Sequence, residues 1–367
     1  MKKIAIITLN GYFNYGNRLQ NLALQKTLQK MGYEVETLRI ERNAKKRNNL
    51  YFISRKLYRK TKLIISNPQE KSHHNREKRF IKFTNEYINE TQNLYQITEK
   101  LEHLKDEYDY FVLGSDQVWN PKMNWGSGVY FANFADSEQI ISYSASFGIS
   151  EIPEAKILDY TNWISKISSI SVREEDGARI VEELTGRKTE VVLDPTMLLS
   201  KKEWEEVSSP APVNSSSYLL TYFLGGIPKE YEEKVIKYAL SNNLEIINLG
   251  DINDSVPYET GPSEFIDYIQ HCDIFFTDSF HGAAFSILFE KPFIAFRRIG
   301  SESMFSRIET LLKTFNFEGR IIDNVDLSGD LMDMDYSVSG KILEEQKGKS
   351  IDFLREALLK DVSENEV

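Results

Sequence analysis

Charged side chains follow several of the apolar runs that predict buried strands. Asp116 lies just beyond the run 111–113, and Arg173 directly follows the run 170–172. His281 stands after a third run, at the start of a predicted helix. An aspartate above a sheet can act as a general acid or base. A guanidinium binds a carboxylate or phosphate through paired hydrogen bonds, and a histidine near a helix N-terminus can act as a base or donate to an anion. These residue types favour a site that binds an anion and moves a proton.

Each of these residues also has an ordinary structural explanation. Asp116 could cap the turn that follows it. Arg173 could form a surface ion pair with a neighbouring glutamate, and His281 could be a core residue. The sequence leaves both interpretations open for each of them.

Small and polar residues accompany the charged ones. The loop 11–17, between the first predicted strand and helix, contains Gly11 and Gly16, which let a ligand approach the backbone closely. The helix that follows offers unpaired N–H groups to an anion, although Asn17 could simply cap it. Hydroxyls and small side chains also occur near other predicted strand ends, at Ser144, Ser146, Ser279 and Gly282.

The composition argues against several classes of function. Cys272 is the single cysteine, so no disulfide forms within the chain and a thiolate-rich metal site is ruled out. No metal-ligand spacing occurs, and we expect neither a metal nor a cofactor. The formal net charge of −10 disfavours a nucleic-acid partner. No apolar run is long enough to cross a bilayer, and we expect a cytoplasmic protein.

Alternating strands and helices must position these residues. Apolar runs predict the strands of a parallel, doubly wound sheet at 4–9, 33–40, 110–113, 140–143, 170–172 and 191–193. After a turn-rich stretch at 200–217, a second series predicts another Rossmann-like domain, with strands at 218–224, 244–249, 274–277 and 293–296. The fold class is therefore α/β, with two Rossmann-like domains facing across a cleft in the GT-B manner. Ligands should bind beyond the carboxyl ends of the strands.

The predicted domain limits follow from these two series. We expect an N-terminal domain over 1–199, with a basic helical insertion at about 41–105. A C-terminal domain should cover 200–335, and a C-terminal helix and tail should cover 336–367.

Seven sequence blocks occur in the order seen in a known family. They are NGYFNYGNRLQN from Asn10, GSDQVWNP from Gly114, YSASFG from Tyr143, SVREEDG from Ser171, VVLDPT from Val191, GPSEFIDYI from Gly261 and TDSFHGAAFSILFEKPF from Thr277. Over about 3–296 the chain resembles the polysaccharide pyruvyl transferases. The resemblance implies a GT-B-like fold. It also implies transfer of the pyruvyl group of phosphoenolpyruvate to hydroxyls of a saccharide, with ketal formation and phosphate release, in surface or capsular polysaccharide biosynthesis.

The resemblance also assigns roles to residues. It implies roles in donor binding and catalysis for Asp116, Arg173 and His281. We expect His281 and Asp116 to be catalytic and Arg173 to bind the donor, and we add Ser279, Gly282, Ser144 and Ser146 to the expected donor site. Hydroxyls of the saccharide acceptor, which could be lipid-linked, would meet Asn14, Tyr15, Asn17 and Trp119. The aromatic side chains of this set could equally pack in the core.

The sequence departs from the family pattern at one position. Relatives often carry an arginine two residues before the histidine, where this chain has Ser279. Either Arg18, Arg297 or Arg298 supplies the missing positive charge, or the donor site has changed. Two other functions therefore stay open: a GT-B glycosyltransferase that uses a nucleotide sugar, and a non-catalytic relative that binds a glycan or a partner protein.

A basic segment at 39–82 contrasts with the acidic remainder of the chain. It carries fifteen Lys or Arg and three acids, so its formal charge is +12 and that of the rest is −22. Apolar residues recur between the basic ones on a helical period. This pattern fits a helix lying on an anionic membrane face, which would make the protein peripheral at the inner membrane surface. The competing interpretation is a helix that packs on the first domain with its basic residues in water.

Overall fold

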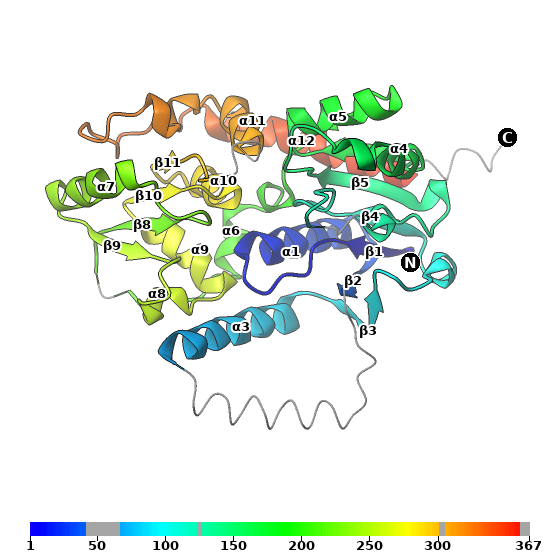
Figure 1. Cartoon of the computed structure of the whole chain (residues 1–367), viewed down its shortest axis with the longest axis horizontal. Coiled ribbons are helices and arrows are strands. Elements are labelled where there is room, and N and C mark those ends of the chain that lie inside the picture. Colours follow the sequence, from blue (N-terminus) through cyan, green and yellow to red (C-terminus); the bar gives the residue numbers. More distant parts are fainter. Residues whose placement is uncertain (42–66, 124–126, 214, 301–304, 360–367) are drawn as a thin grey trace.

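The computed structural model describes all residues except 42–66, 124–126, 214, 301–304 and 360–367. Its N-terminal part is built on one parallel sheet in the order β3-β2-β1-β4-β5-β6-β7 (Figure 1). The strands are β1 (Lys3–Ile7), β2 (Glu34–Glu41), β3 (Glu90–Gln96), β4 (Tyr110–Leu113), β5 (Ile140–Ala145), β6 (Ser169–Val172) and β7 (Glu190–Val191). All pairings in the sheet are parallel, which brings the carboxyl ends of its strands to one edge.

Helices cover both faces of this sheet. Alternate residues of β1 point to opposite faces. Ile4 and Ile6 pack in one apolar cluster with α1 (Tyr15–Lys30) and α12 (Ser339–Leu359). Ala5 and Ile7 belong to another cluster, with α4 (Ile157–Ser165) and α5 (Glu175–Thr185). The central strand is therefore buried on both sides, as its uninterrupted apolar sequence predicts.

The C-terminal part holds a second parallel sheet in the order β11-β10-β8-β9. Its strands are β8 (Tyr218–Tyr222), β9 (Glu245–Asn248), β10 (Ile274–Thr277) and β11 (Phe293–Ala295). The helices of this part are α7 (Lys229–Ser241), α8 (Ser255–Tyr258), α9 (Pro262–His271), α10 (Phe280–Phe289) and α11 (Ser306–Thr314). The short α6 (Lys201–Glu205) lies between the two series, and Trp204 anchors it in the core.

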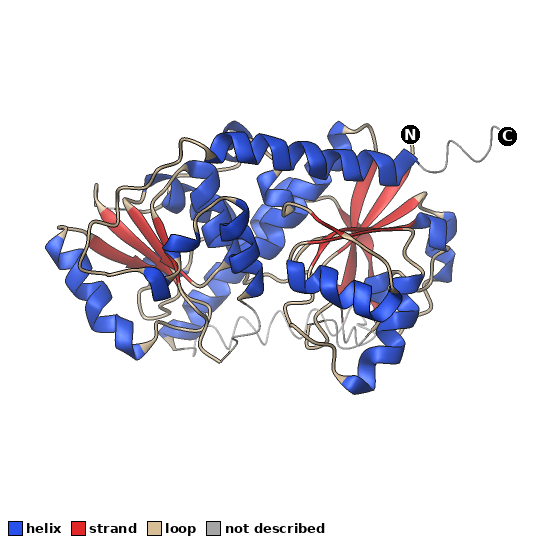
Figure 2. Cartoon of the chain, turned by 90° about the horizontal axis from the view of Figure 1, so that it is seen from above, coloured by secondary structure: helices blue, strands red, loops and turns tan. Residues whose placement is uncertain are grey.

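Helices fill the space between the two sheets (Figure 2). One apolar cluster is continuous across it, because Tyr15 and Leu19 of α1 pack with Phe265 of α9 and Phe285 of α10. Helix α3 (Pro68–Tyr87) joins this cluster from below α1 (Figure 1). After the second sheet the chain returns to the first, where the Tyr110 hydroxyl donates to the Leu358 carbonyl of α12 over 2.9 Å.

The predicted α/β class, with two parallel Rossmann-like sheets in a GT-B arrangement, is confirmed. The helical interpretation of the insertion was incomplete, because β3 lies within it. This edge strand buries Thr91 and Tyr95 and exposes Gln92 and Asn93, and its register with β2 shifts between Thr37 and Arg39. The sequence did not predict β3, because the strand is polar in composition and its buried residues do not alternate regularly with exposed ones. None of the described helices combines the length and apolarity needed to span a membrane.

Candidate functional site

The strand ends of the first sheet meet the start of α10 from the second domain. Asp116 follows β4, Arg173 follows β6, and Asp194 follows β7. His281 lies in the first turn of α10, and its Nε2 is 3.5 Å from Asp194 Oδ2. The four side chains form one buried polar cluster, to which each domain contributes.

Carboxylates surround Arg173, whose side chain is only 1% exposed. Its Nη1 donates to Asp194 Oδ2 over 2.9 Å, and its Nη2 lies 3.5 Å from Asp116 Oδ1. The guanidinium also lies 4.3 Å from the ring centre of Phe280. Burial acts to lower the pKa of Arg173, but the three carboxylates of Asp194, Asp116 and Glu174 outweigh it and raise this pKa above its ordinary value. Arg173 is therefore a fixed cation at physiological pH.

Asp194 is the hub of the cluster. Its Oδ1 accepts from the Thr196 N–H at 3.0 Å and from the Thr196 hydroxyl at 2.7 Å. Its Oδ2 accepts from Arg173 and from the Ser115 hydroxyl at 2.7 Å. Burial acts to raise the pKa of Asp194, but His281, Arg173 and the Thr196 N–H hold it well below its usual range. An ionised Asp194 so close to His281 can orient the imidazole.

The imidazole of His281 lies directly against α1. A Cβ added to Gly16 would come within 1.9 Å of His281 Nδ1 and 2.4 Å of its Cε1. With such a Cβ present, the imidazole or the helix backbone would have to move. The absence of a side chain at Gly16 therefore permits this contact between the domains. The same turn of α1 contains Asn17, whose side-chain amide donates to Asp116 Oδ2.

The backbone is strained where the strands end at this cluster. Asp116 has a φ of +68° and Ser144 a φ of +52°, in the left-handed region that residues other than glycine rarely occupy. Buried polar atoms that lack a hydrogen-bond partner among the described residues also gather here: Ser144 Oγ, Arg173 Nε, Glu174 Oε2 and His281 Nε2. Strain and unsatisfied polar atoms are both typical of functional sites.

The remaining carboxylate, Glu174, organises the turn after β5. Its Oε1 accepts from the Ser146 hydroxyl at 2.8 Å and from the backbone N–H groups of Phe147 and Gly148 at 3.0 and 3.3 Å. Its Oε2 is 3.9 Å from Arg173 Nε. Ser146 therefore supports the site through Glu174.

The residues of this cluster lie in a part of the chain that matches a known protein family. The family model described as polysaccharide pyruvyl transferase matches residues 14–299, which include the whole cluster. The chain belongs to this family. It is therefore a transferase. Curated protein sequences give no significant match.

Solved structures of low sequence identity are similar over nearly the whole chain. HepE of Anabaena, solved with UDP and glucose, is 9% identical, with 98% of this chain and 100% of that one covered and a TM-score of 0.49. The UDP-N-acetylglucosamine 2-epimerase of Rickettsia bellii is 8% identical, with 97% and 96% covered and a TM-score of 0.48. For E. coli ADP-heptose lps heptosyltransferase II the identity is 12%, the coverage 99% and 100%, and the TM-score 0.33.

Among the residues that the sequence analysis selected, Asp116, Arg173, His281 and Asn17 come together in this buried cluster. Ser279 is the N-cap of α10, and its hydroxyl accepts from the Gly282 N–H at 3.3 Å. Asn14 is a half-buried N-cap residue of α1 whose side chain makes no capping bond.

The two aromatic candidates lie in the core. Tyr15 is fully buried, stacks on Phe265 at 4.2 Å between ring centres, and bonds through its hydroxyl to Thr260. Trp119 is also fully buried and stacks on Phe131 at 5.4 Å. Core packing, the alternative weighed for these residues, accounts for both.

Three charged residues of the site escaped the sequence analysis: Asp194, Glu174 and Arg307. Asp194 and Glu174 stand in the blocks VVLDPT and SVREEDG, at strand ends, so the signal that identified Asp116 could have found them. Arg307 of α11 carries no such signal. Burial, with Arg173 nearby, lowers the pKa of Arg307 to about 10, and the carboxylates of Glu174 and Asp116 act against that change.

The cations proposed to replace the family arginine already have partners. Arg18 is buried and pairs with Glu90 at 2.9 Å. Arg297 pairs with Asp323 and Glu309, and Arg298 with Asp278 at 3.3 Å. Arg298 also acts electrostatically on Arg307, whose pKa the cluster residues Arg173, Glu174 and Asp116 influence as well.

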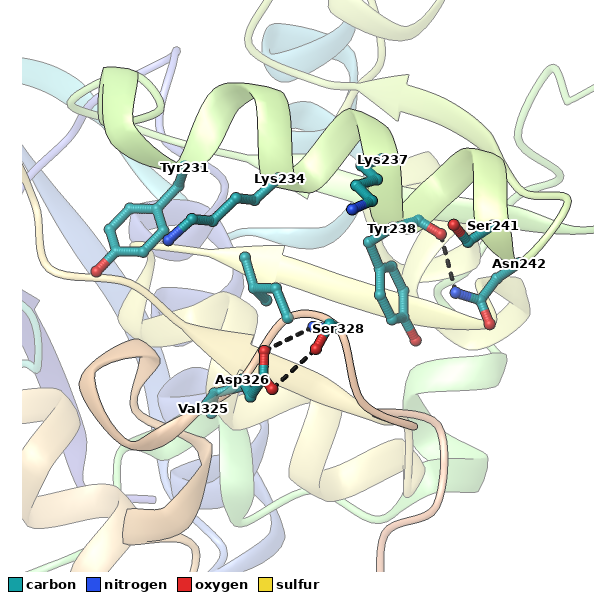
Figure 3. Close-up of a pocket in the computed structure, with 10 residues that line it drawn as sticks. Tyr231, Lys234, Lys237, Tyr238, Ser241, Asn242, Val325, Asp326 and Ser328 are labelled. Carbon is teal, nitrogen blue, oxygen red and sulfur yellow. Dashed lines mark hydrogen bonds between the residues drawn. The ribbon is translucent and has the colours of Figure 1, made fainter.

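No group of His, Cys, Asp and Glu able to hold a metal ion occurs in the described part of the chain. A cavity of about 30 Å³, lined by Arg173, Asp194 and Phe280 with residues of α11, has room for about one water molecule. A larger cavity of about 350 Å³ lies apart from the cluster, between α7 and the loop 325–328 (Figure 3). Lys234, Lys237 and Tyr231 line it, and no residue selected from the sequence does.

Proposed function

We propose that this transferase moves the pyruvyl group of phosphoenolpyruvate onto two hydroxyls of a saccharide and releases phosphate. Family membership supports the reaction class. The observation that carries the proposal is the His281–Asp194 pair, with Nε2 and Oδ2 3.5 Å apart and Arg173 bonded to the same carboxylate oxygen. His281 provides a group that can transfer a proton, and Arg173 provides a cation that can form two parallel hydrogen bonds. Transfer from phosphoenolpyruvate needs both.

The proposed reaction adds two hydroxyls to one carbon in succession. A proton adds to the methylene carbon of the donor, positive character develops at the carbon that bears the phosphate, and the first sugar oxygen bonds there as its hydroxyl loses a proton. The bond from this carbon to the phosphate oxygen then breaks, and the second hydroxyl closes the cyclic ketal. Its proton leaves with the phosphate, so the reaction is balanced without an oxidant or a cofactor.

The geometry favours one division of roles. His281 would protonate the methylene carbon, because its imidazole can transfer a proton and Asp194 Oδ2, 3.5 Å from Nε2, can hold the ring in place. Asp116 would accept the proton of the attacking hydroxyl, with its carboxylate held by the Asn17 amide. The sequence had left the acid and base roles of His281 and Asp116 open.

Arg173 would exchange one partner when the donor binds. Its bond to Asp194 is short, at 2.9 Å, whereas its contact with Asp116 is long, at 3.5 Å. An oxygen of the donor carboxylate or phosphate can replace Asp116 at Nη2. This exchange would hold the donor and release Asp116 for its role as base.

We further propose that the basic segment 39–82 holds the protein against an anionic membrane face. A lipid-linked acceptor of surface or capsular polysaccharide biosynthesis would be presented there. Much of 39–82 lies outside the described residues. In its described part, α3 exposes Lys71, Lys78 and Lys82, while the helix packs between the domains. Sedimentation with vesicles tests this: we expect attachment to anionic but not neutral vesicles, weakened by salt. Changing the three lysines to Gln should reduce it, and the same change at Lys229, Lys234 and Lys237 of α7 should not. Absence of binding at low salt contradicts the hypothesis.

Turnover with phosphoenolpyruvate and a saccharide panel tests the proposed reaction. Phosphate release is measured together with mass spectrometry of the saccharide, and we expect a pyruvyl mass increment that appears with the phosphate. His281→Ala should abolish both. His271→Ala is the matched control, because this histidine of α9 is 67% exposed and lies outside the cluster. Release of a nucleotide from a nucleotide sugar, with no use of phosphoenolpyruvate, contradicts the proposal.

A further inference from the structure

Helix α3 crosses from the first domain to the second. It enters the shared apolar core through Phe80 and Phe83 and lies beneath α1 and beside α8 and α9 (Figure 1). Its start is capped by Asn67, whose side chain accepts from the Glu70 N–H at 2.8 Å. The helix therefore has well-defined contacts on both domains.

The centre of this contact is Arg76, which is 4% exposed. Its Nη1 donates to the carbonyls of Leu249 and Tyr258 over 3.1 and 2.7 Å, at the end of β9 and in α8. Its Nη2 donates to the Phe13 carbonyl over 3.4 Å. One guanidinium thus joins the second domain to the loop before α1.

Aromatic rings enclose the same guanidinium. Its carbon lies 4.6 Å from the ring centre of Tyr15, 4.9 Å from that of Tyr258 and 5.6 Å from that of Phe80. The described partners of Arg76 are therefore backbone carbonyls, π faces and the Tyr222 hydroxyl of β8. A buried arginine satisfied in this way holds its neighbours in one geometry, because carbonyls cannot rotate away from it as side chains can.

The loop that Arg76 holds leads directly into the site. Phe13 is followed within one turn by Gly16, which lies against His281, and by Asn17, which bonds to Asp116. We propose that Arg76 is a positioning residue that fixes the alignment of the two domains, and with it the placement of His281 over the first domain's carboxylates. This inference does not depend on the identity of the donor, since it concerns only where the proton-transfer groups stand.

Two other residues of α3, His73 and Arg79, also contact the second domain and support the same alignment. His73 stacks on Phe13 at 4.1 Å between ring centres and bonds to the Tyr258 hydroxyl at 3.0 Å. Arg79 pairs with Glu264 of α9 through a side chain that is 46% exposed. Because an exposed ion pair contributes little, Arg79 offers a control on the same helix that also bridges the domains.

The experiment measures the distance between the domains together with turnover. Cys272 is buried and is the chain's single cysteine, so cysteines introduced at Leu158 of α4 and Leu240 of α7, both 73% exposed, can be labelled selectively. Spin-label distance distributions and kcat are compared for the parent, Arg76→Met, Arg76→Lys and Arg79→Met.

We expect Arg76→Met to broaden or shift the distance distribution and to lower kcat by about tenfold to a hundredfold, as misplacement by about 1 Å can do. Arg76→Lys should show a smaller change in both, and Arg79→Met should stay within about twofold of the parent. A folded Arg76→Met with the parental distance distribution overturns the proposal. If Arg76→Met does not fold, a parental distance and kcat in Arg76→Lys overturn it. The distance measurement needs no substrate, so failure to use phosphoenolpyruvate would contradict the proposed function and leave this test intact.

Discussion

Two of the buried arginines, Arg173 and Arg76, differ in what surrounds them. Arg173 lies among the carboxylates of Asp194, Asp116 and Glu174, at the end of a strand in the first domain. Arg76 lies among backbone carbonyls and aromatic rings, at the contact between the domains. Carboxylates on side chains can move, change protonation or give way to another anion, whereas carbonyls of packed elements cannot. The first environment suits chemistry, and the second suits alignment.

Replacement of His281 should have the largest effect on the rate of transfer. It tests the chemical role that we assign to the surroundings of Arg173. In His281→Ala the group proposed to protonate the donor is missing, and we expect transfer to fall by about a hundredfold to ten-thousandfold. The fold should persist, because the ring lies between polar groups and not in an apolar cluster. Steady-state rates and thermal unfolding measure the two effects. Parental transfer in a folded variant would remove His281 from the chemistry.

Arg173→Lys should have the next largest effect. A lysine keeps the charge near Asp194 but cannot bind Asp194 and the donor in parallel. We expect kcat/KM for phosphoenolpyruvate to fall by about tenfold to a hundredfold, as the loss of one charged hydrogen bond implies. Arg297→Lys, at an exposed ion pair, serves as control. Unchanged donor affinity in Arg173→Lys would mean that Arg173 only holds the carboxylates in place.

Gly16→Ala tests the close approach between the domains. The added methyl group would overlap His281 Nδ1, so the imidazole must move away from Asp194 or the domains must part. We expect kcat to fall by about tenfold. Gly319→Ala adds a methyl group where no atom lies within 4 Å and should leave kcat unchanged. Equal rates for the two variants would show that the position of His281 is not critical.

The pH dependence of stability should show the smallest effect. The pKa of Asp194 is lower in the folded protein than in the unfolded chain, where it is about 3.9. Its ionised form therefore stabilises the fold above about pH 4, and this contribution is lost as the pH falls toward the folded pKa. In urea unfolding, the stability difference between the parent and Asp194→Asn should be constant above about pH 5 and shrink below about pH 4. Asp352→Asn, on the exposed face of α12, serves as the control variant. A difference that stays constant down to pH 3 contradicts the assignment.

The sequence predicted the sheets well because buried parallel strands are apolar along their whole length, as at 110–113 and 274–277. It did not predict β3, whose buried residues alternate irregularly with polar ones. In the site, residues next to strands were predictable in type and place. Their partners were not, because the contact of His281 with Asp194 and Gly16 depends on how two domains meet. The burial of Arg76 was hidden for the same reason, since a basic helix looks solvent-exposed until its neighbours are known.

A double-mutant cycle on pyruvyl transfer tests most directly whether Asp194 and His281 work as one unit. Rates of phosphate release and pyruvyl incorporation are measured for the parent, Asp194→Asn, His281→Ala and the double variant. Residues that act as a unit are strongly non-additive. We therefore predict that the double variant is no slower than His281→Ala by more than about twofold. Losses that multiply in the double variant would show that the two residues act independently and would contradict the account.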